Sequence, residues 1–321
     1  MKRRAFVSAA VGACAVPAIA RAQAPWPARP IRFIVPYIPG SAPDTIARQL
    51  AERLGPAIGQ TVVIENRGGA GGNIGTEMIA KSSADGYTIG LATSAMVTNP
   101  WLYSKAGYDP INDFTPIHLS ISMPHLLVVP AEAPVRTVSE LVKLAREAPG
   151  RYNYASGGNG SGAHLAAELF KSAAGVDIVY VPYKGAPEII TSVISGSTLC
   201  GFPTLATAVP QVKAGRLRAL GVTGMTRNHA VPDVPPISET VAGYQLVSWF
   251  GVVGPAKMPG EIAARIEAAL LRSLSEPQVR DRVQSDGAEA VNQGQQAFAE
   301  VIRTDFARMK RTVEIARARV D

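Results

Sequence analysis

The 321-residue chain is poor in the residues from which most catalytic and nucleic-acid-binding sites are built. Aromatic residues make up only 6%, which argues against a surface for stacking bases. The chain has two cysteines and four histidines, and it contains no G-x-S-x-G, H-E-x-x-H or paired-cysteine motif. The sequence therefore predicts no enzyme, no metal site and no cofactor.

The chain also lacks a long hydrophobic run, because no segment beyond the N-terminus is apolar for the ~18 residues that a membrane span needs. At the N-terminus, "MKRR" is followed by the short apolar run "AFVSAAVGACAVPAIA" and by the small residues of "ARAQA". This order is typical of a cleaved export signal, which we predict over residues 1–22. "RRAFV" also fits a twin-arginine signal, so the general and the twin-arginine routes both stay open. A lipoprotein box at Cys14 is the alternative.

Removal of this segment changes the charge and the cysteine content of the protein. Residues 1–22 hold four basic residues, so the net charge falls from +7 to +3 (7 − 4). Most of the basicity that would favour nucleic acid is thereby lost. Cys200 is then the single cysteine, so no intramolecular disulfide is expected and stability must come from core packing.

Short β-branched runs alternate with amphipathic helical patterns along most of the chain, as where "IRFIVPY" leads to "DTIARQLAERL". This alternation is typical of parallel-sheet α/β domains. After "YQLVSWFGVVGP" we expect two long helices with no further strand. Crossovers near 120–128 and 246–252 would divide the chain into two α/β lobes, with a ligand cleft between them.

Three loops join an expected strand to an expected helix: "PGSAPD", "RGGAGGNIG" and "SGGNGSGAH". Such loops point backbone N–H groups at the positive end of a helix dipole, which suits anions. Ordinary capping is the alternative, with Ser41 and Asp44 forming a capping box and Asn159 or Ser161 capping the later helix. A dinucleotide-binding reading of "GNGSGA" is weak, because Asp177 precedes the next strand instead of ending it.

The four histidines, at positions 118, 125, 164 and 229, are expected at surface or loop positions. His164 is the exception, because it opens the helix after the third glycine-rich loop. The alternative to a binding protein is an exported serine hydrolase that uses Ser156 or Ser161 with His164. No nucleophile elbow and no orienting acid support it.

Taken in order, the motifs resemble one family. They include "WPARPIRFIVPYIPG", "VVIENRGGAGGNIG", "ADGYTIGLATSAMVTNPWLY", "ASGGNGSGAHLAAELF", "VPYKG", "VKAGRLRALGVT" and "WFGVVGPAKMP". The chain resembles the Bug-type (TctC-like) periplasmic solute receptors of tripartite tricarboxylate transporters over residues 25–321. The resemblance implies a type II periplasmic-binding-protein fold without catalysis. One lobe would comprise residues 25–124 plus 251–321, and the other residues 125–250.

The resemblance also implies where a ligand binds. Backbone N–H groups around Ser41 and Ala42 would hold one carboxylate, and a second loop in the other lobe would hold the other end of the ligand. Asp44 is expected to order its loop and not to touch an anion. The full set of expected ligand-binding residues is Tyr37, Gly40, Ser41, Ala42, Thr93, Ser94, Ser156, Asn159, Gly160, Ser161, His164 and Tyr183.

The implied partners are a small organic carboxylate and the permease subunits of the transporter, with the receptor acting as a periplasmic monomer. A signalling ectodomain is the alternative partner. Two residues depart from the family pattern. Ser41 replaces a second glycine, which would be costly if the backbone there needs a positive φ. Pro203 stands where the family often has an acid, which argues against an amino-acid ligand.

Overall fold

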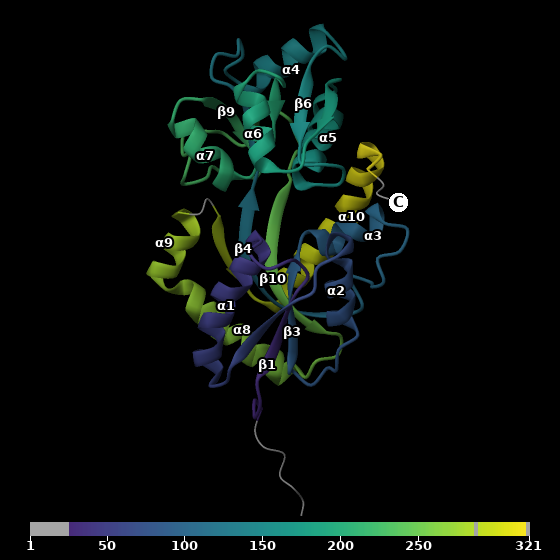
Figure 1. The fold of residues 1–321 in the computed structure, drawn as a ribbon, viewed down its shortest axis with the longest axis vertical. Coiled ribbons are helices and arrows are strands. Elements are labelled where there is room, and N and C mark those ends of the chain that lie inside the picture. Colours follow the sequence, from purple (N-terminus) through teal and green to yellow (C-terminus); the bar gives the residue numbers. More distant parts are fainter. Residues whose placement is uncertain (1–25, 286–287, 319–321) are drawn as a thin grey trace, which may run out of the picture.

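The computed structural model describes residues 26–285 and 288–318, and these form two α/β lobes stacked along the long axis of the molecule (Figure 1). Each lobe is built around its own β-sheet. The two-lobed α/β architecture predicted from the sequence is thereby confirmed. The predicted signal, residues 1–22 with Cys14, lies outside the described residues.

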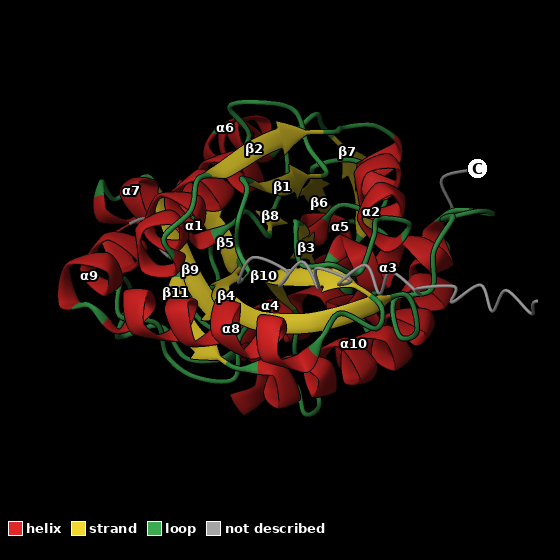
Figure 2. Cartoon of the chain, turned by 90° about the horizontal axis from the view of Figure 1, so that it is seen from below, coloured by secondary structure: helices red, strands yellow, loops and turns green. Residues whose placement is uncertain are grey.

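The large-sheet lobe is organised around six strands in the order β11-β4-β10-β3-β1-β2. The strands are β1 (Ile31–Val35), β2 (Val62–Asn66), β3 (Thr88–Thr93), β4 (Phe114–Pro124), β10 (Val247–Pro255) and β11 (Glu289–Gln293). Helices cover the faces of this sheet (Figure 2): α1 (Ala42–Ile58), α2 (Asn73–Ala80), α3 (Ala95–Leu102), α8 (Gly260–Ser275), α9 (Pro277–Ser285) and α10 (Gln295–Ala316).

The small-sheet lobe is organised around five strands in the order β7-β6-β8-β5-β9. The strands are β5 (Leu126–Pro130), β6 (Asn153–Ser156), β7 (Val179–Pro182), β8 (Cys200–Gly201) and β9 (Leu217–Val222). Its helices are α4 (Val138–Glu147), α5 (Gly162–Ala174), α6 (Ala186–Ile194) and α7 (Leu205–Lys213). Cys200 is buried here, and burial raises the pKa of its thiol to about 12, so it is a core residue.

Both sheets are mixed, whereas the alternation along the sequence predicted parallel sheets. β1 is parallel to β2 and β3, but β10 is antiparallel to both β3 and β4. In the small sheet, β5 is antiparallel to β8 and β9. β5 and β10, the strands at which the chain enters a sheet from the other lobe, run against the parallel strands of that sheet. β11 also runs against β1, β2 and β3, because it pairs antiparallel with β4.

The chain passes between the lobes at two adjacent places. β4 ends at Pro124 in the large sheet and β5 begins at Leu126 in the small one. The return strand β10 starts at Val247, which pairs with Pro124. Residues 247–250 thus belong to the large sheet, four residues before the predicted boundary at 251. The division into residues 25–124 plus 251–321 and 125–250 stays a prediction.

The C-terminal region differs from the expected pair of long helices. The short strand β11 lies between α9 and α10 and extends the large sheet beside β4. α10 then spans both lobes, since Phe306 stacks on Trp101 of α3 while Val313 packs in the core of the small-sheet lobe. Figure 1 shows α10 rising past α3 towards α5.

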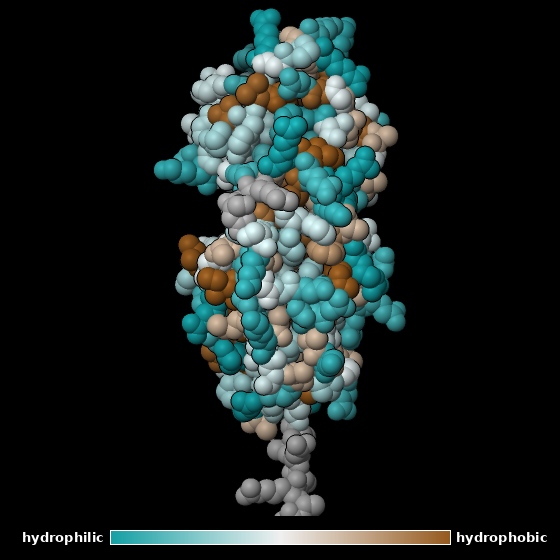
Figure 3. Space-filling model, turned by 90° about the vertical axis from the view of Figure 1, so that its right-hand side faces the viewer, coloured by the Kyte–Doolittle hydropathy of each residue, from teal (hydrophilic) through white to brown (hydrophobic). Residues whose placement is uncertain are grey.

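The surface view in Figure 3 shows polar residues over most of one face, with the apolar groups in small separate patches. Within residues 26–285 and 288–318, no helix combines the length and the apolar character needed to cross a membrane. The same described residues hold no cluster of three side chains suited to a metal ion.

Candidate functional site

The first candidate loop joins β1 to α1 and runs from Pro36 to Asp44. Gly40 adopts a left-handed backbone (φ 78°), and Ser41 follows as the N-cap in an extended conformation (φ −73°, ψ 160°). The strain expected from a serine in place of a second glycine therefore does not arise, because the positive φ falls on Gly40 alone. Ala42 opens the helix next to Pro43, so the N–H groups of the first turn point out of the helix end.

The side chains of this loop do not form the expected capping box. Ser41 Oγ donates to the Ile38 carbonyl (2.7 Å) and caps no N–H. Asp44 reaches back one residue further and accepts the Gly40 N–H at 2.8 Å. Its carboxylate also accepts from Arg48 Nε (3.0 Å) and Asn66 Nδ2 (2.9 Å).

Asp44 is almost fully buried among these donors. The hydrogen bond from Arg48 is the largest influence and lowers the pKa of the carboxyl to about 2. Because all of its acceptor oxygens face protein donors, the carboxylate fixes the loop. These contacts support the prediction that Asp44 orders its loop. They do not test that role directly, so it stays a prediction.

Tyr37 and Thr93 come from the ends of two neighbouring strands, β1 and β3. Their hydroxyl oxygens lie 3.0 Å apart, and Thr93 Oγ1 also accepts the Ala95 N–H. Burial raises the pKa of Tyr37, so the phenol stays a neutral donor. Ser94 follows at the start of α3 in a helical conformation. The structure thus brings Tyr37, Thr93 and Ser94 together below the first loop.

The second candidate loop joins β6 to α5 in the small-sheet lobe and has nearly the same backbone. Gly160 is left-handed (φ 74°), and Ser161 is the extended N-cap (φ −65°, ψ 157°). Here the serine does cap the helix, since its Oγ accepts the His164 N–H at 3.2 Å. Ser156 Oγ lies 3.4 Å from Ser161 Oγ and also donates to the Gly158 carbonyl.

His164 occupies the place that Asp44 holds in the first loop. Its Nδ1 accepts the Gly160 N–H at 3.2 Å. Burial lowers the pKa of the imidazole, and its ring packs on Tyr180 with centroids 4.6 Å apart. The N–H of Gly160 is therefore engaged within the loop, as are the N–H of Ser161, which donates to the Gly158 carbonyl, and the N–H of His164.

This geometry gives no support to the hydrolase alternative. A general base must reach the serine hydroxyl with its ring nitrogen. His164 meets Ser161 through its backbone N–H, while its Nδ1 is occupied by the Gly160 N–H. Ser156 and Ser161 are paired with each other and with a backbone carbonyl.

Tyr183 flanks the second loop. Its N–H donates to the Ser156 carbonyl at 2.8 Å, and its hydroxyl accepts from Ser192 Oγ at 2.7 Å. Asn159 lies at the loop tip between the left-handed glycines 158 and 160. The residues predicted in the small-sheet lobe, Ser156, Asn159, Gly160, Ser161, His164 and Tyr183, thus form one neighbourhood.

The two lobes meet directly behind the second loop. A cavity of about 90 Å³ is lined by Ser94 and Asn99 from one lobe and by Gly160 and Gly162 from the other. Gly160 packs so closely on Leu102 of α3 that a Cβ there would lie 3.0 Å from the leucine side chain. A second cavity, of about 360 Å³, places Ala42 of the first loop opposite Ala206 of α7.

The expectation that the histidines lie at surface or loop positions was wrong for His118 and His125, while His164 is the exception named from the sequence. His118, His125 and His164 are buried, and only His229 is exposed. His125 sits at the crossover between β4 and β5. Its Nδ1 lies 2.9 Å from the Phe202 carbonyl and its Nε2 lies 3.1 Å from Ser248 Oγ. Burial lowers its pKa, so it bridges the strands at the crossover as a neutral ring.

The sequence analysis did not place His125 beside the second loop. Gly162 of α5 packs directly against His125, since a Cβ at position 162 would lie 2.8 Å from His125 Nε2. The sequence did offer one indication that His125 is buried. In "MPHLLVVP" it is a single polar ring at the start of an otherwise apolar strand.

The comparisons with known proteins agree with this architecture. A family model described as the tripartite tricarboxylate transporter family receptor matches residues 46–317. The solved structure of the R. palustris protein Rpa4515 with adipate is 34% identical, covers 91% of this chain and 98% of its own, and superposes with a TM-score of 0.76. MatC from Rhodopseudomonas palustris with bound malate is 28% identical, covers 90% and 100%, and gives 0.71. The periplasmic binding protein BugD is 28% identical, covers 92% and 99%, and gives 0.72. These matches confirm the sequence resemblance and the periplasmic-binding-protein fold.

Proposed function

Because the chain belongs to the tripartite tricarboxylate transporter receptor family, we propose that it binds a small organic dicarboxylate between its lobes. The observation that carries this proposal is the pair of matching loops. Each lobe presents a left-handed glycine, a serine N-cap and the N-terminus of a helix. Two N–H-rich sites in two lobes suit a ligand with an anionic group at each end.

The known ligands of relatives support the same chemical class. Adipate and malate, which accompany two of the similar structures, both carry two carboxylates. In the proposed complex, the N–H groups at Ser41 and Ala42 hold one carboxylate. The first turn of α5, with the loop residues Ser156, Asn159 and Ser161 before it, holds the other, while Tyr37, Thr93 and Tyr183 donate from the walls. No cationic side chain is required, since several oriented amides stabilise an anion directly.

We propose that the protein works in the periplasm after removal of residues 1–22, as a monomer that presents its ligand to a membrane permease. The family description supports the transporter partner, and the name of BugD supports the compartment. Closure of the lobes on the ligand would create the surface to which the permease binds. Capture of a signalling ectodomain instead of a permease from solubilised membranes would contradict this choice of partner.

The proposal is tested by titrating the purified protein with adipate, malate, citrate, terephthalate, nicotinate, aspartate and glutamate. Calorimetry should show binding of at least one dicarboxylate, and the same acid should raise the melting temperature, because it binds the folded state only. The absence of both effects for every acid would overturn the proposal.

A matched pair of variants tests the site. Ala42 is exposed at the first helical position, where an acidic side chain favours the helix. Ala42→Asp should therefore fold normally, yet weaken dicarboxylate binding at least about tenfold by charge repulsion. Ala42→Asn has nearly the same size without the charge and should bind far better than Ala42→Asp. Equal affinity of both variants would place the ligand elsewhere.

A further inference from the structure

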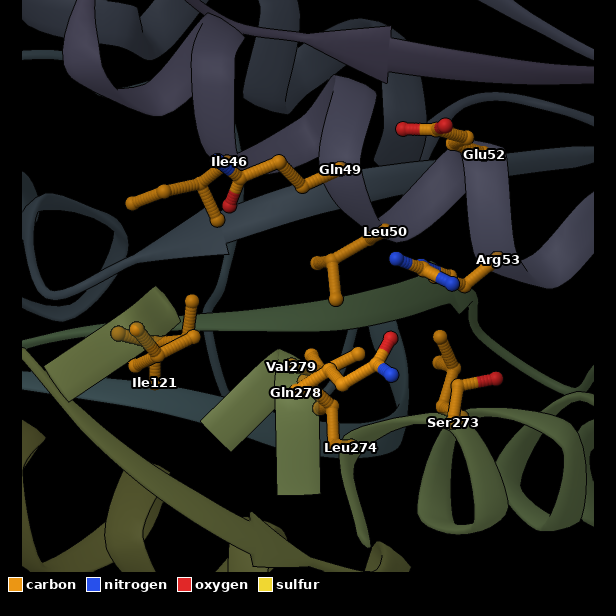
Figure 4. A pocket seen from close by; sticks show the side chains of 12 residues that line it. Ile46, Gln49, Leu50, Glu52, Arg53, Ile121, Ser273, Leu274, Gln278 and Val279 are labelled. Atoms are coloured by element: carbon orange, nitrogen blue, oxygen red, sulfur yellow. The ribbon is translucent and has the colours of Figure 1, made fainter. Parts of the chain in front are cut away.

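A second pocket lies on the flank of the large-sheet lobe, enclosed by α1, α8, α9 and β4 (Figure 4). Its volume is about 230 Å³. None of the residues predicted for the dicarboxylate site lines it. The pocket therefore belongs to neither loop described above.

The pocket has an apolar part and a polar part. Its apolar walls come from four elements and consist of Ile46, Leu50, Ile121, Leu270, Leu274, Val279 and Val283. At the other end, Figure 4 shows the Arg53 guanidinium turned into the space between Leu50 and Gln278. Glu52 also lines the pocket, but in Figure 4 its carboxylate lies well away from the guanidinium.

Arg53 retains donors for a ligand. Its nearest carboxylate oxygen, on Glu276, is 3.8 Å away, and both side chains are about half exposed (47% and 55%). That distance is too long for a hydrogen bond, and exposed pairs of this kind contribute little. A guanidinium with free donors at the end of an apolar pocket matches a carboxylate that carries an apolar tail.

The volume limits the length of the tail. If each non-hydrogen atom takes the ~30 Å³ that a water molecule occupies in the liquid, 230 Å³ holds about eight such atoms. Six carbons and two carboxylate oxygens fill this number. A second carboxylate at the far end of the same molecule would lie among Ile46, Ile121 and the neutral amide of Gln49. Among the residues that the structure describes, no cationic side chain lines that end of the pocket, and burial of an unpaired charge there is costly.

We infer that this pocket is a second ligand site, which takes a short unbranched aliphatic monocarboxylate with its carboxylate on Arg53 and its tail among Ile46, Leu50 and Leu274. The inference does not depend on the proposed dicarboxylate site, because none of the residues proposed to hold the dicarboxylate lines this pocket. The cavity beside Ala42 is its neighbour, and the two share Ile46, Gln49, Ile121 and Val283. The apolar tail supplies most of the affinity, and Arg53 supplies the preference for an acid.

The direct test titrates the purified protein with hexanoate, using hexan-1-ol and adipate as matched probes of the same length. Methyl NMR of the unmodified protein should show saturable shifts with hexanoate at Leu50, Leu270 and Leu274, which line this pocket and not the cavity beside Ala42. Adipate should leave these methyl groups unchanged. No saturation by about 10 mM hexanoate, or shifts confined to the lobe interface, would overturn the inference.

Two variants divide the roles of tail and head group. Val279 is half-buried at the pocket wall, so Val279→Phe should fill the pocket and abolish hexanoate binding. Arg53→Gln should raise the hexanoate Kd about threefold to tenfold and leave hexan-1-ol binding unchanged. Arg280→Gln, on the exposed part of α9 outside the pocket, is the matched control and should bind both probes as the unmodified protein does.

The alternative outcomes are decisive. Hexanoate binding that survives Val279→Phe would place the acid outside this pocket, and the methyl spectrum would show that the variant is folded. Equal hexanoate affinities of Arg53→Gln and Arg280→Gln would remove Arg53 from the site. Dicarboxylate binding should be the same in all three variants. A negative result for hexanoate therefore leaves the proposed dicarboxylate site between the lobes unaffected.

Discussion

The two loops at helix N-termini, Gly40–Asp44 and Gly160–His164, have nearly the same backbone in different lobes. Both begin with a left-handed glycine and a serine N-cap, and in both the fourth residue after the glycine accepts the N–H of that glycine. The difference is chemical. Asp44 is a buried anion held by Arg48, whereas His164 is a neutral ring held against Tyr180.

The comparison shows how the same backbone can be stabilised in two ways. In the first loop the Asp44 carboxylate makes the stabilising contacts, and the Ser41 hydroxyl only donates to the Ile38 carbonyl. In the second loop Ser161 supplies the helix cap itself. The first loop therefore depends on one ion and its donors, while the second distributes its stability over neutral hydrogen bonds and ring packing.

The largest effect that this comparison predicts is that of Asp44→Ala. The pKa of Asp44 falls from 3.8 to about 2 on folding, which corresponds to roughly 2 kcal/mol of stability at neutral pH. Loss of the carboxylate also leaves the Gly40 N–H and Asn66 without their acceptor. Urea unfolding should show a loss of about 2–3 kcal/mol, together with weaker dicarboxylate binding.

The conservative control for this experiment is Asp44→Asn, which keeps the size but removes the charge. It should recover less than half of the lost stability, because Arg48 then faces a neutral amide. If Asp44→Ala unfolds at the same urea concentration as the unmodified protein, the charge does not hold the first loop and the contrast with His164 fails.

A smaller effect distinguishes the two serines. Ser161→Ala removes a helix cap and should cost about 1 kcal/mol. Ser41→Ala removes only an exposed hydroxyl contact to the Ile38 carbonyl and should cost less than about 0.5 kcal/mol. Chemical unfolding of both variants measures the difference. Equal losses would mean that Ser41 also caps its helix in solution.

Much of this pair of loops could be predicted from the sequence. The strand, glycine, N-cap and helix order is visible in "PGSAPD" and "NGSGAH", and the ordered motifs led to the correct fold and family. The equivalence of Asp44 and His164 was not visible, because the two residues share no chemistry until the backbone places each of them over a glycine N–H.

Long-range contacts set the limit of such prediction. His125 meets Phe202 and Ser248, which are 77 and 123 residues away, and no local pattern encodes either contact. The same holds for α10. Its amphipathic pattern predicted a helix, but only the packing of Val313 in the small-sheet lobe shows that it spans both lobes.

The smallest effect expected from the comparison is the pH dependence of the two loops. Burial lowers the pKa of His164 below its ordinary value of 6.5, with Lys171 adding to this shift and Glu168 opposing it. The folded state then binds fewer protons than the unfolded state, so this stability is present above about pH 6.5 and is lost as the pH falls through the lowered pKa. The contribution of Asp44 is retained until the pH falls below about 4 and is lost towards pH 2.

Stability curves between pH 7 and pH 5 can therefore separate the loops. Asp44→Asn should keep the pH dependence of the unmodified protein in this range, because Asp44 does not titrate there. His164→Asn should flatten it, since an amide oxygen can accept the Gly160 N–H in place of Nδ1 but does not titrate. Burial also lowers the pKa values of His118 and His125, so every variant should retain some dependence of stability on pH. Identical slopes for His164→Asn and the unmodified protein would show that His164 is not the titrating group that distinguishes the second loop from the first.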